Sequence, residues 1–309
     1  MKFLITGANG DIAKSICKLI KKNFKNAIVD GTDTKINKKR IKNLYGKIYK
    51  VPLPKNKSYL GKIIKLSNNY NLIIPTTENE IIFISNHIHS FKNKVLINSK
   101  NIIKIFSSKL NTYSYLKKRN FKVPKFCFKL DYLKKFHEPF FLKKDFGHGN
   151  KNYKVISSNK EFLSLKKSNK NWIAQEYLDK SFKEYTCGIV RLKKFSDVII
   201  LERKLKGGYT YFAKRVKNKR IKNSLLKLAK DVNLNGCINV QLKYKKNRYA
   251  IFEINPRISS TVYMRDMLNF KDCYWWINYL IYKKIPSSNY KILNKSIIKI
   301  NNNEKYINQ

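Results

Sequence analysis

The sequence predicts an α/β fold in which a doubly wound domain is followed by a domain that mixes strands and helices. The first observation is the order of elements at the start: an apolar stretch at 2–6, the glycine turn GANGDIA, and an amphipathic helix at 13–22. Strand, glycine turn and helix in that order open a doubly wound domain. The second observation is the alternation of apolar and polar residues over 236–244 and 248–254, because a period of two is typical of strands.

The elements that follow the first helix continue the alternation of strand and helix. We expect strands at 26–30, 47–51 and 70–75 and a helix at 58–67. Another helix begins at the segment TTENE, where Thr76 or Thr77 can cap the first turn. The loop after the carboxyl end of a buried strand is where α/β domains bind ligands, so this segment is a candidate binding loop.

The N-terminal glycine turn leaves a second class of function open. The pattern G-x-x-G-x-x-A at 7–13 is a partial dinucleotide fingerprint, and Asp30 follows where a ribose-binding acid would lie. A nicotinamide-dependent oxidoreductase is therefore an alternative. It would need a hydride-transfer site later in the chain, and we expect neither Tyr45–Lys47 nor Tyr279–Lys283 to supply it.

Composition narrows the possible partners. The chain has 309 residues, enough for two domains, and a formal net charge of +48. Its lysines are spread along the whole length together with abundant Asn, Ile, Tyr and Phe. We attribute most of the charge to the composition of the source genome and do not expect nucleic acid as a partner. A basic nucleic-acid binder remains an alternative, since high positive charge is its electrostatic signature.

Cysteine spacing and hydropathy indicate the compartment. The five cysteines are scattered without a C-x-x-C spacing, which argues against a zinc site or a disulfide framework and for a reducing compartment. The start of the chain lacks the apolar core of a signal peptide, and no apolar run approaches the ~18 residues that span a bilayer. We therefore expect a soluble, cytoplasmic protein with no membrane partner.

Polar side chains at the end of the last long strand form the first candidate site. Glu253, Asn255 and Arg257 stand at i, i+2 and i+4, so on a strand they share one face. Carboxylate and amide oxygens suit Mg²⁺, and a neighbouring arginine can bind a phosphate with its forked guanidinium. Gln241 could add a third oxygen if the two strands pair across 245–247. The alternatives are a solvated strand end and, for Gln241, a buried amide that satisfies backbone groups.

Both strands resemble a known family. The segments GCINVQ at 236–241 and FEINPR at 252–257 resemble the last two metal-site strands of the ATP-grasp superfamily, and within it the branch of the carbamoyl-phosphate-synthase large chain. The resemblance implies that Gln241, Glu253 and Asn255 hold Mg²⁺ or Mn²⁺ on the phosphates of ATP. It also implies an N-terminal Rossmann-like, pre-ATP-grasp domain followed by an ATP-grasp domain of two subdomains.

A second segment, EPFFLKKDFGHGNKNYKV, resembles the ATP-grasp lid, in which a strand, a lysine and a glycine-rich loop bind phosphate. The resemblance implies that Lys143 is the phosphate-binding lysine and that Gly147 and Gly149 let backbone N–H groups approach phosphate oxygens. Lys144 stands where many relatives have proline, so the assignment could shift by one residue. Lys109, on a helix before a Val-Pro turn, is likewise similar to a phosphate-binding residue of the family.

The segments QEYL and EYT resemble the nucleoside-binding part of the superfamily. In QEYL the resemblance implies that Glu176, Tyr177 and Leu178 belong to the hinge that holds adenine. In EYT it implies that Glu184 binds the ribose hydroxyls, for which a carboxylate is a suitable acceptor. The spacing between the two acids is slightly long for the family.

Five further residues have two interpretations each. Glu78 and Glu80 either stabilise the first turn of a helix or contact the acceptor substrate. Arg203, Lys206 and Lys214 are either candidates for binding the transferred phosphate or solvated side chains.

These observations give one prediction for the whole chain. We expect a Rossmann-like domain at 1–105, an ATP-grasp domain at 106–290 with a lid at about 125–175, and a frayed C-terminal tail at 291–309. The resemblance implies a ligase that uses ATP and Mg²⁺, forms a C–N bond through an acyl phosphate, and releases ADP and phosphate, with Arg257 and Lys143 as catalytic residues. Its partners would be a small carboxylate and an amine, and a homodimer is left open. A protein that binds ATP without ligating is a further alternative.

Overall fold

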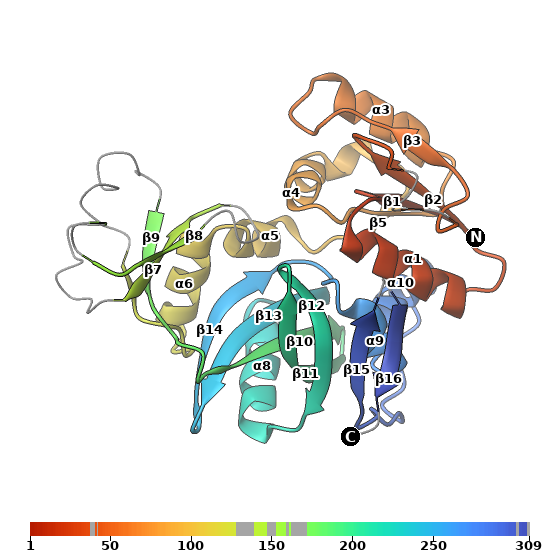
Figure 1. Ribbon diagram of the computed structural model, residues 1–309. Coiled ribbons are helices and arrows are strands. Elements are labelled where there is room, and N and C mark those ends of the chain that lie inside the picture. Colours follow the sequence, from red (N-terminus) through yellow and green to blue (C-terminus); the bar gives the residue numbers. More distant parts are fainter. Residues whose placement is uncertain are drawn as a thin grey trace.

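The computed structural model contains three sheets, which are a parallel sheet of five strands, an antiparallel sheet of seven and a smaller sheet of four (Figure 1). The structure describes residues 1–37, 41, 43–127, 139–146, 153–158, 161, 172–300 and 303–307. Among the helices of this part of the chain, none is both long and apolar enough to cross a membrane. The predicted α/β class with an N-terminal parallel sheet and later antiparallel sheets is confirmed.

The N-terminal domain is the parallel sheet, with the strand order β3-β2-β1-β4-β5. Its strands are β1 (Lys2–Thr6), β2 (Ile28–Asp33), β3 (Ile48–Lys50), β4 (Leu72–Ile74) and β5 (Lys94–Val95). Its helices are α1 (Asp11–Asn23), α3 (Ser58–Ser67), α4 (Glu78–Asn86) and the short η1 (Ile88–Ser90). β1 and β4 consist almost entirely of buried residues, as the central strands of a parallel sheet do. The strand order reverses beside β1, and ligands bind such sheets outside the carboxyl ends of the strands at that point.

Two short helices connect this domain to a small antiparallel sheet. The helices are α5 (Lys100–Phe106) and α6 (Lys109–Lys118), and serine side chains at Ser99 and Ser108 cap their first turns. The sheet has the order β6-β9-β7-β8, with strands β6 (Phe126–Cys127), β7 (Phe140–Lys144), β8 (Tyr153–Ile156) and β9 (Trp172–Glu176). It lies within the segment for which the sequence predicts a lid.

The seven-stranded sheet forms the centre of the remaining chain. Its strands are β10 (Lys183–Leu192), β11 (Phe195–Lys206), β12 (Tyr209–Val216), β13 (Gly236–Lys245), β14 (Arg248–Asn255), β15 (Ser296–Ile300) and β16 (Asn303–Ile307). The helices are α8 (Lys219–Asp231), α9 (Val262–Met267) and α10 (Asp272–Tyr282). Leucines and an isoleucine of α8 pack against β11 and β10 and share one buried core with residues of β13. This core lies between the helix and the sheet (Figure 1).

A second core joins the two ends of the chain. Ile16 and Leu19 of α1 belong to the same buried cluster as Trp276 and Ile277 of α10, so the parallel sheet and the C-terminal helices share one apolar interior. The expectation of a frayed tail is wrong for β15 and β16. Ile297 is fully buried and β15 pairs with β12. The pairing satisfies backbone groups at the edge of β12 and removes apolar side chains from water, which favours a strand over a frayed tail.

Candidate active site

A cleft of about 630 Å³ lies where the three sheets meet. It is lined by the loops after β1 and β4, by the four-stranded sheet, and by one face of β10, β11, β13 and β14. It therefore contains the point at which ligands bind a doubly wound sheet. Most of the residues that the sequence singles out are brought together there. They are Lys109, Lys143, Tyr177, Leu178, Glu184, Gln241, Glu253, Asn255 and Arg257.

The expected metal ligands meet on neighbouring strands. β13 pairs antiparallel with β14, and in this register Gln241 lies directly opposite Glu253. The amide of Asn255 donates a hydrogen bond of 2.9 Å to Glu253 Oε1, so these two side chains share a face as the alternation predicts. Pro256 follows, and since proline has no N–H group the ladder of β14 ends there and Arg257 lies beyond the strand.

The donor set fits a hard divalent cation. Asn255 is 2% exposed, and its Oδ1 has no hydrogen-bond partner among the residues that the structure describes, although a buried carbonyl oxygen ordinarily has one. With Glu253 and Gln241 it makes one carboxylate and two amide oxygens, the ligand type that Mg²⁺ prefers. Since only one of the three groups is charged, a cation here would need phosphate oxygens as further ligands.

Lysines and an arginine lie along the cleft beside these oxygens. Lys143 Nζ on β7 donates a hydrogen bond of 2.9 Å to the buried Gln175 Oε1, and Lys109 Nζ donates one of 3.2 Å to Asp145 O. Burial lowers the pKa of Lys143 to about 8, an effect that the charge of Glu253 partly opposes. Arg257 is partly buried, and burial also lowers the pKa of its guanidinium. Cations that are partly removed from water attract a phosphate more strongly than fully solvated lysines do.

An apolar part of the cleft is lined by the four-stranded sheet and the residues that follow β9. The rings of Phe141 and Tyr177 are 4.9 Å apart, and Leu178 is only 4% exposed. A flat aromatic base can pack against such side chains, so this part suits adenine. The sequence indicated Tyr177 and Leu178, but it gave no signal for Phe141, whose role depends on the pairing of β7 with β9.

One of the expected nucleotide contacts, Glu176, has its side chain outside the cleft. The carboxylate of Glu176 does not line the cleft and pairs with Arg248 at 2.7 Å, while it accepts a hydrogen bond of 3.1 Å from Lys125 N. Any contact of Glu176 with adenine would therefore have to come from its backbone. Gly147 and Gly149 lie outside the described residues.

Glu184 lies in the cleft but is already paired. Arg203 binds its Oε1 at 2.5 Å, and Lys243 Nζ is 3.2 Å from its Oε2. Burial opposes ionisation of this carboxyl, yet the two cations hold its pKa below the usual range. A ribose would therefore meet a carboxylate that already has hydrogen-bond donors on both oxygens.

The loop after β4 separates the roles of its two acids. Glu80 is buried and accepts hydrogen bonds from the hydroxyls of Thr6, Thr77 and Tyr59 at 2.7 to 3.0 Å, so it fixes the loop and does not face the cleft. Burial, with the charge of Glu253 adding to it, raises the pKa of Glu78 to about 7, against the opposing charges of Arg257 and Lys109.

The acid expected for a nicotinamide cofactor is part of the core. Asp30 is 6% exposed, its Oδ1 accepts a hydrogen bond from Lys47 N at 2.7 Å, and its Oδ2 accepts one from the Tyr70 hydroxyl at 2.6 Å. With both oxygens engaged inside the domain, Asp30 offers no contact to a ribose. The oxidoreductase alternative loses the residue that would have supported it.

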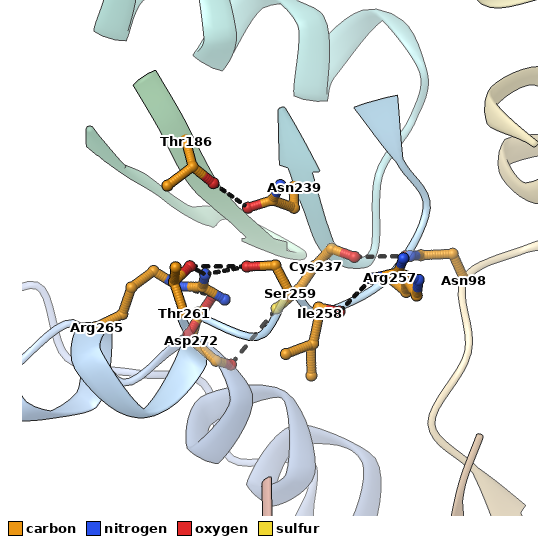
Figure 2. A network of polar contacts seen from close by, with 10 residues as sticks. All are labelled: Asn98, Thr186, Cys237, Asn239, Arg257, Ile258, Ser259, Thr261, Arg265 and Asp272. Carbon is orange, nitrogen blue, oxygen red and sulfur yellow. Dashed lines mark hydrogen bonds and ion pairs between the residues drawn. The ribbon is translucent and has the colours of Figure 1, made fainter. Parts of the chain in front are cut away.

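A buried ion pair supports the loop that follows Arg257 (Figure 2). Arg265 of α9 is 1% exposed and binds Asp272 of α10 at 2.8 Å, and its Nη1 donates hydrogen bonds of 2.7 Å to the hydroxyls of Ser259 and Thr261. Both hydroxyl residues line the cleft. The shape of this side of the cleft therefore depends on a charge pair in the core beneath it.

Comparison with known proteins gives one consistent fold. Residues 168–305 match a family described as ATP-grasp in the biosynthetic pathway with Ter operon, and no curated protein sequence matches the chain. Among solved structures, the chain is similar to N5-carboxyaminoimidazole synthetase from Staphylococcus aureus complexed with ADP, with a TM-score of 0.77 and 16% identity over 97% of this chain and 82% of that one. It is also similar to a biotin carboxylase–β-γ-ATP complex from Campylobacter jejuni, with a TM-score of 0.73 and 15% identity over 96% and 74% of the two chains.

Proposed function

We propose that the chain is a member of the ATP-grasp superfamily and an ATP- and Mg²⁺-dependent ligase that joins a carboxylate to an amine through an acyl phosphate. The family match at 168–305 and the shared fold support this proposal. One observation carries the proposal. A single cleft contains an apolar part that fits a base, partly buried cations that fit phosphates, and a set of oxygens that fits Mg²⁺.

The nucleotide would lie with its adenine between Phe141 and Leu178 and its phosphates toward Lys143. Lys109 and Arg257 would neutralise the remaining phosphate charge, and the low exposure of these groups strengthens each contact. A magnesium ion held by Gln241, Glu253 and Asn255 would supply further neutralisation of the phosphate oxygens when bound.

The chemistry then requires mainly positioning. A carboxylate oxygen of the substrate attacks the γ-phosphorus, the bond from that phosphorus to the bridging oxygen breaks, and ADP leaves with the electron pair. The amine nitrogen next attacks the carbonyl carbon of the acyl phosphate, phosphate leaves, and the nitrogen loses a proton. Arg257 lies where it can hold the attacking carboxylate and the transferred phosphoryl group.

The acceptor substrates would occupy the end of the cleft away from the adenine. Thr76 and Thr77 from the N-terminal domain face the same space as Ser259, Ser260 and Thr261. These hydroxyls can donate to and accept from a small polar molecule. Glu78, which follows Thr76 and Thr77 and has a pKa of about 7, would take the proton from an amine at neutral pH.

Calorimetry and an assay of phosphate release test the proposal together. The protein should bind a non-hydrolysable ATP analogue in a Mg²⁺-dependent way and should not bind NADH or NADPH. Glu253→Ala should remove the dependence on Mg²⁺ and abolish phosphate release with any pair of carboxylate and amine that supports it. The matched control is Glu202→Ala, which removes a carboxylate that pairs with Lys183 outside the cleft. Full activity of Glu253→Ala would refute the assignment of the metal ligands.

A further inference from the structure

Arg203 on β11 occupies a position that the proposed function leaves unexplained. Its Nη2 donates a hydrogen bond of 2.5 Å to Glu184 Oε1 and another of 2.9 Å to Gln241 Oε1, while its Nε donates one of 2.9 Å to the same Glu184 oxygen. The side chain is 12% exposed and lines the cleft. The guanidinium therefore joins the residue expected to bind ribose to a residue expected to bind the metal.

This arrangement neutralises the acidic side of the cleft. Lys243 lies 3.2 Å from the other oxygen of Glu184, so that carboxylate is balanced by two cations and cannot add negative charge to a metal site. Glu253 is then the one carboxylate of the three expected ligands. The side-chain oxygen of Gln241 already accepts a hydrogen bond from this guanidinium. A divalent cation that approached the oxygen would therefore be repelled by the positive charge of Arg203.

A triphosphate would change the balance. It brings several negative charges to the cations of the cleft, and a guanidinium binds phosphate with the same forked geometry as carboxylate. An arginine held by one carboxylate and one neutral amide can exchange these partners for phosphate oxygens. The exchange would release Gln241 Oε1 at the moment when phosphate oxygens become available as further metal ligands.

We propose that Arg203 is a nucleotide-binding residue that enforces an order of binding: it closes Gln241 to the divalent cation until a triphosphate draws its guanidinium away. The inference rests on the proposed function, since it takes ATP and a divalent cation as the ligands. It differs from a simple structural role, because a bridge between two strands would not couple the binding of metal to the binding of nucleotide.

Mn²⁺ titrations followed by electron paramagnetic resonance test the order directly. The wild-type protein should bind Mn²⁺ weakly alone and at least tenfold more tightly with a non-hydrolysable ATP analogue. Arg203→Met should bind Mn²⁺ alone at least tenfold more tightly than wild type and bind the analogue about tenfold more weakly. Lys204→Met is the matched control, because it removes the neighbouring positive charge, whose Nζ lies over the Phe212 ring, and it should behave as wild type.

A second variant covers the case in which Arg203→Met does not fold. Arg203→Lys keeps the charge but can no longer bridge two partners, so it should bind Mn²⁺ alone with an affinity between those of wild type and Arg203→Met. Equal affinity of Mn²⁺ for wild type and the Arg203 variants in the absence of nucleotide would overturn the inference while leaving the ligase proposal intact. Failure of the wild-type protein to bind the ATP analogue under any condition would instead remove the proposed function.

Discussion

Removing the Arg265 side chain should both weaken the fold and loosen the cleft. Arg265→Met deletes a guanidinium that is 1% exposed, binds Asp272 at 2.8 Å and donates to two hydroxyls of the cleft loop. Methionine fills part of the volume but leaves a fully buried carboxylate without its cation. Breaking a buried ion pair in this way typically costs about 3–5 kcal/mol of unfolding free energy. That is a large part of the roughly 5–15 kcal/mol that stabilises a domain.

Urea denaturation followed by tryptophan fluorescence measures this loss, since Trp275 and Trp276 lie on the helix that carries Asp272. With a dependence of about 1–3 kcal/mol per molar urea, the midpoint should fall by roughly 1 M or more. Lys271→Met is the matched control, because it removes a cation next to Asp272 whose Nζ lies over the Tyr274 ring, and it should change stability by less than about 0.5 kcal/mol.

The double variant Arg265→Met, Asp272→Leu separates charge from contact. If the uncompensated carboxylate causes most of the loss, removing it as well should recover at least half of the stability, because apolar replacements of buried ion pairs are often neutral. Affinity for the ATP analogue should stay reduced, since Ser259 and Thr261 still lack their donor. A change of less than 1 kcal/mol in Arg265→Met would refute the reasoning.

Three further predictions concern other parts of the molecule. Burial lowers the pKa of Lys143 to about 8, so its positive charge is present below pH 8 and lost above it. Affinity for the ATP analogue, titrated from pH 6.5 to 9.5, should therefore fall by up to about tenfold per pH unit above 8. Lys143→Arg should flatten this pH profile, because arginine keeps its charge. Gly188→Ala places a Cβ 2.7 Å from the Arg265 side chain and should cost about 1–3 kcal/mol in thermal unfolding, whereas Gly61→Ala, in an open helical position, should be neutral or stabilising. Glu304→Gln removes a buried negative charge that binds Lys18 of α1 at 2.8 Å. The variant should be cleaved faster in limited proteolysis at the hairpin of β15 and β16, because the hairpin loses its ion pair with α1. Unchanged cleavage rates would show that this ion pair does not hold the hairpin in place.

The alternation of residues in the sequence predicted the core of the candidate site. Apolar residues at every second position of 238–244 place Asn239 and Gln241 together on the other face of that strand. The pairing of Gln241 with Glu253 also depends on an irregularity in the register between Gln241 and Leu242, because a regular ladder from the turn would set Gln241 opposite Phe252. The bounds of α3 agree with the predicted helix at 58–67. The alternation and the helix bounds are local properties of the sequence.

Contacts between distant segments could not be predicted in the same way. Asp30 reads as a ribose-binding acid from its spacing after the glycine turn, but its position opposite Tyr70 makes it a core residue. The ion pair of Glu176 with Arg248 removes a carboxylate from the cleft, and the bridge made by Arg203 depends on three strands lying side by side. The buried C-terminal strand was missed because its alternation is short and its partner, β12, lies far away in the sequence.

The place of β15 in the sheet also bears on how the chain is made. β12 ends at Val216 and its outer edge stays unpaired until Ser296 and the residues after it have left the ribosome. At synthesis rates of about 5–20 residues per second, the edge waits roughly 4–16 s for its neighbour. Lys214 lies in the segment of β12 that pairs with β15, and Arg215 follows it. Both residues place positive charge along that edge until β15 has been synthesised. Charged side chains are a common defence of an open strand against pairing with other chains, and here they would protect a growing polypeptide until its last strands arrive.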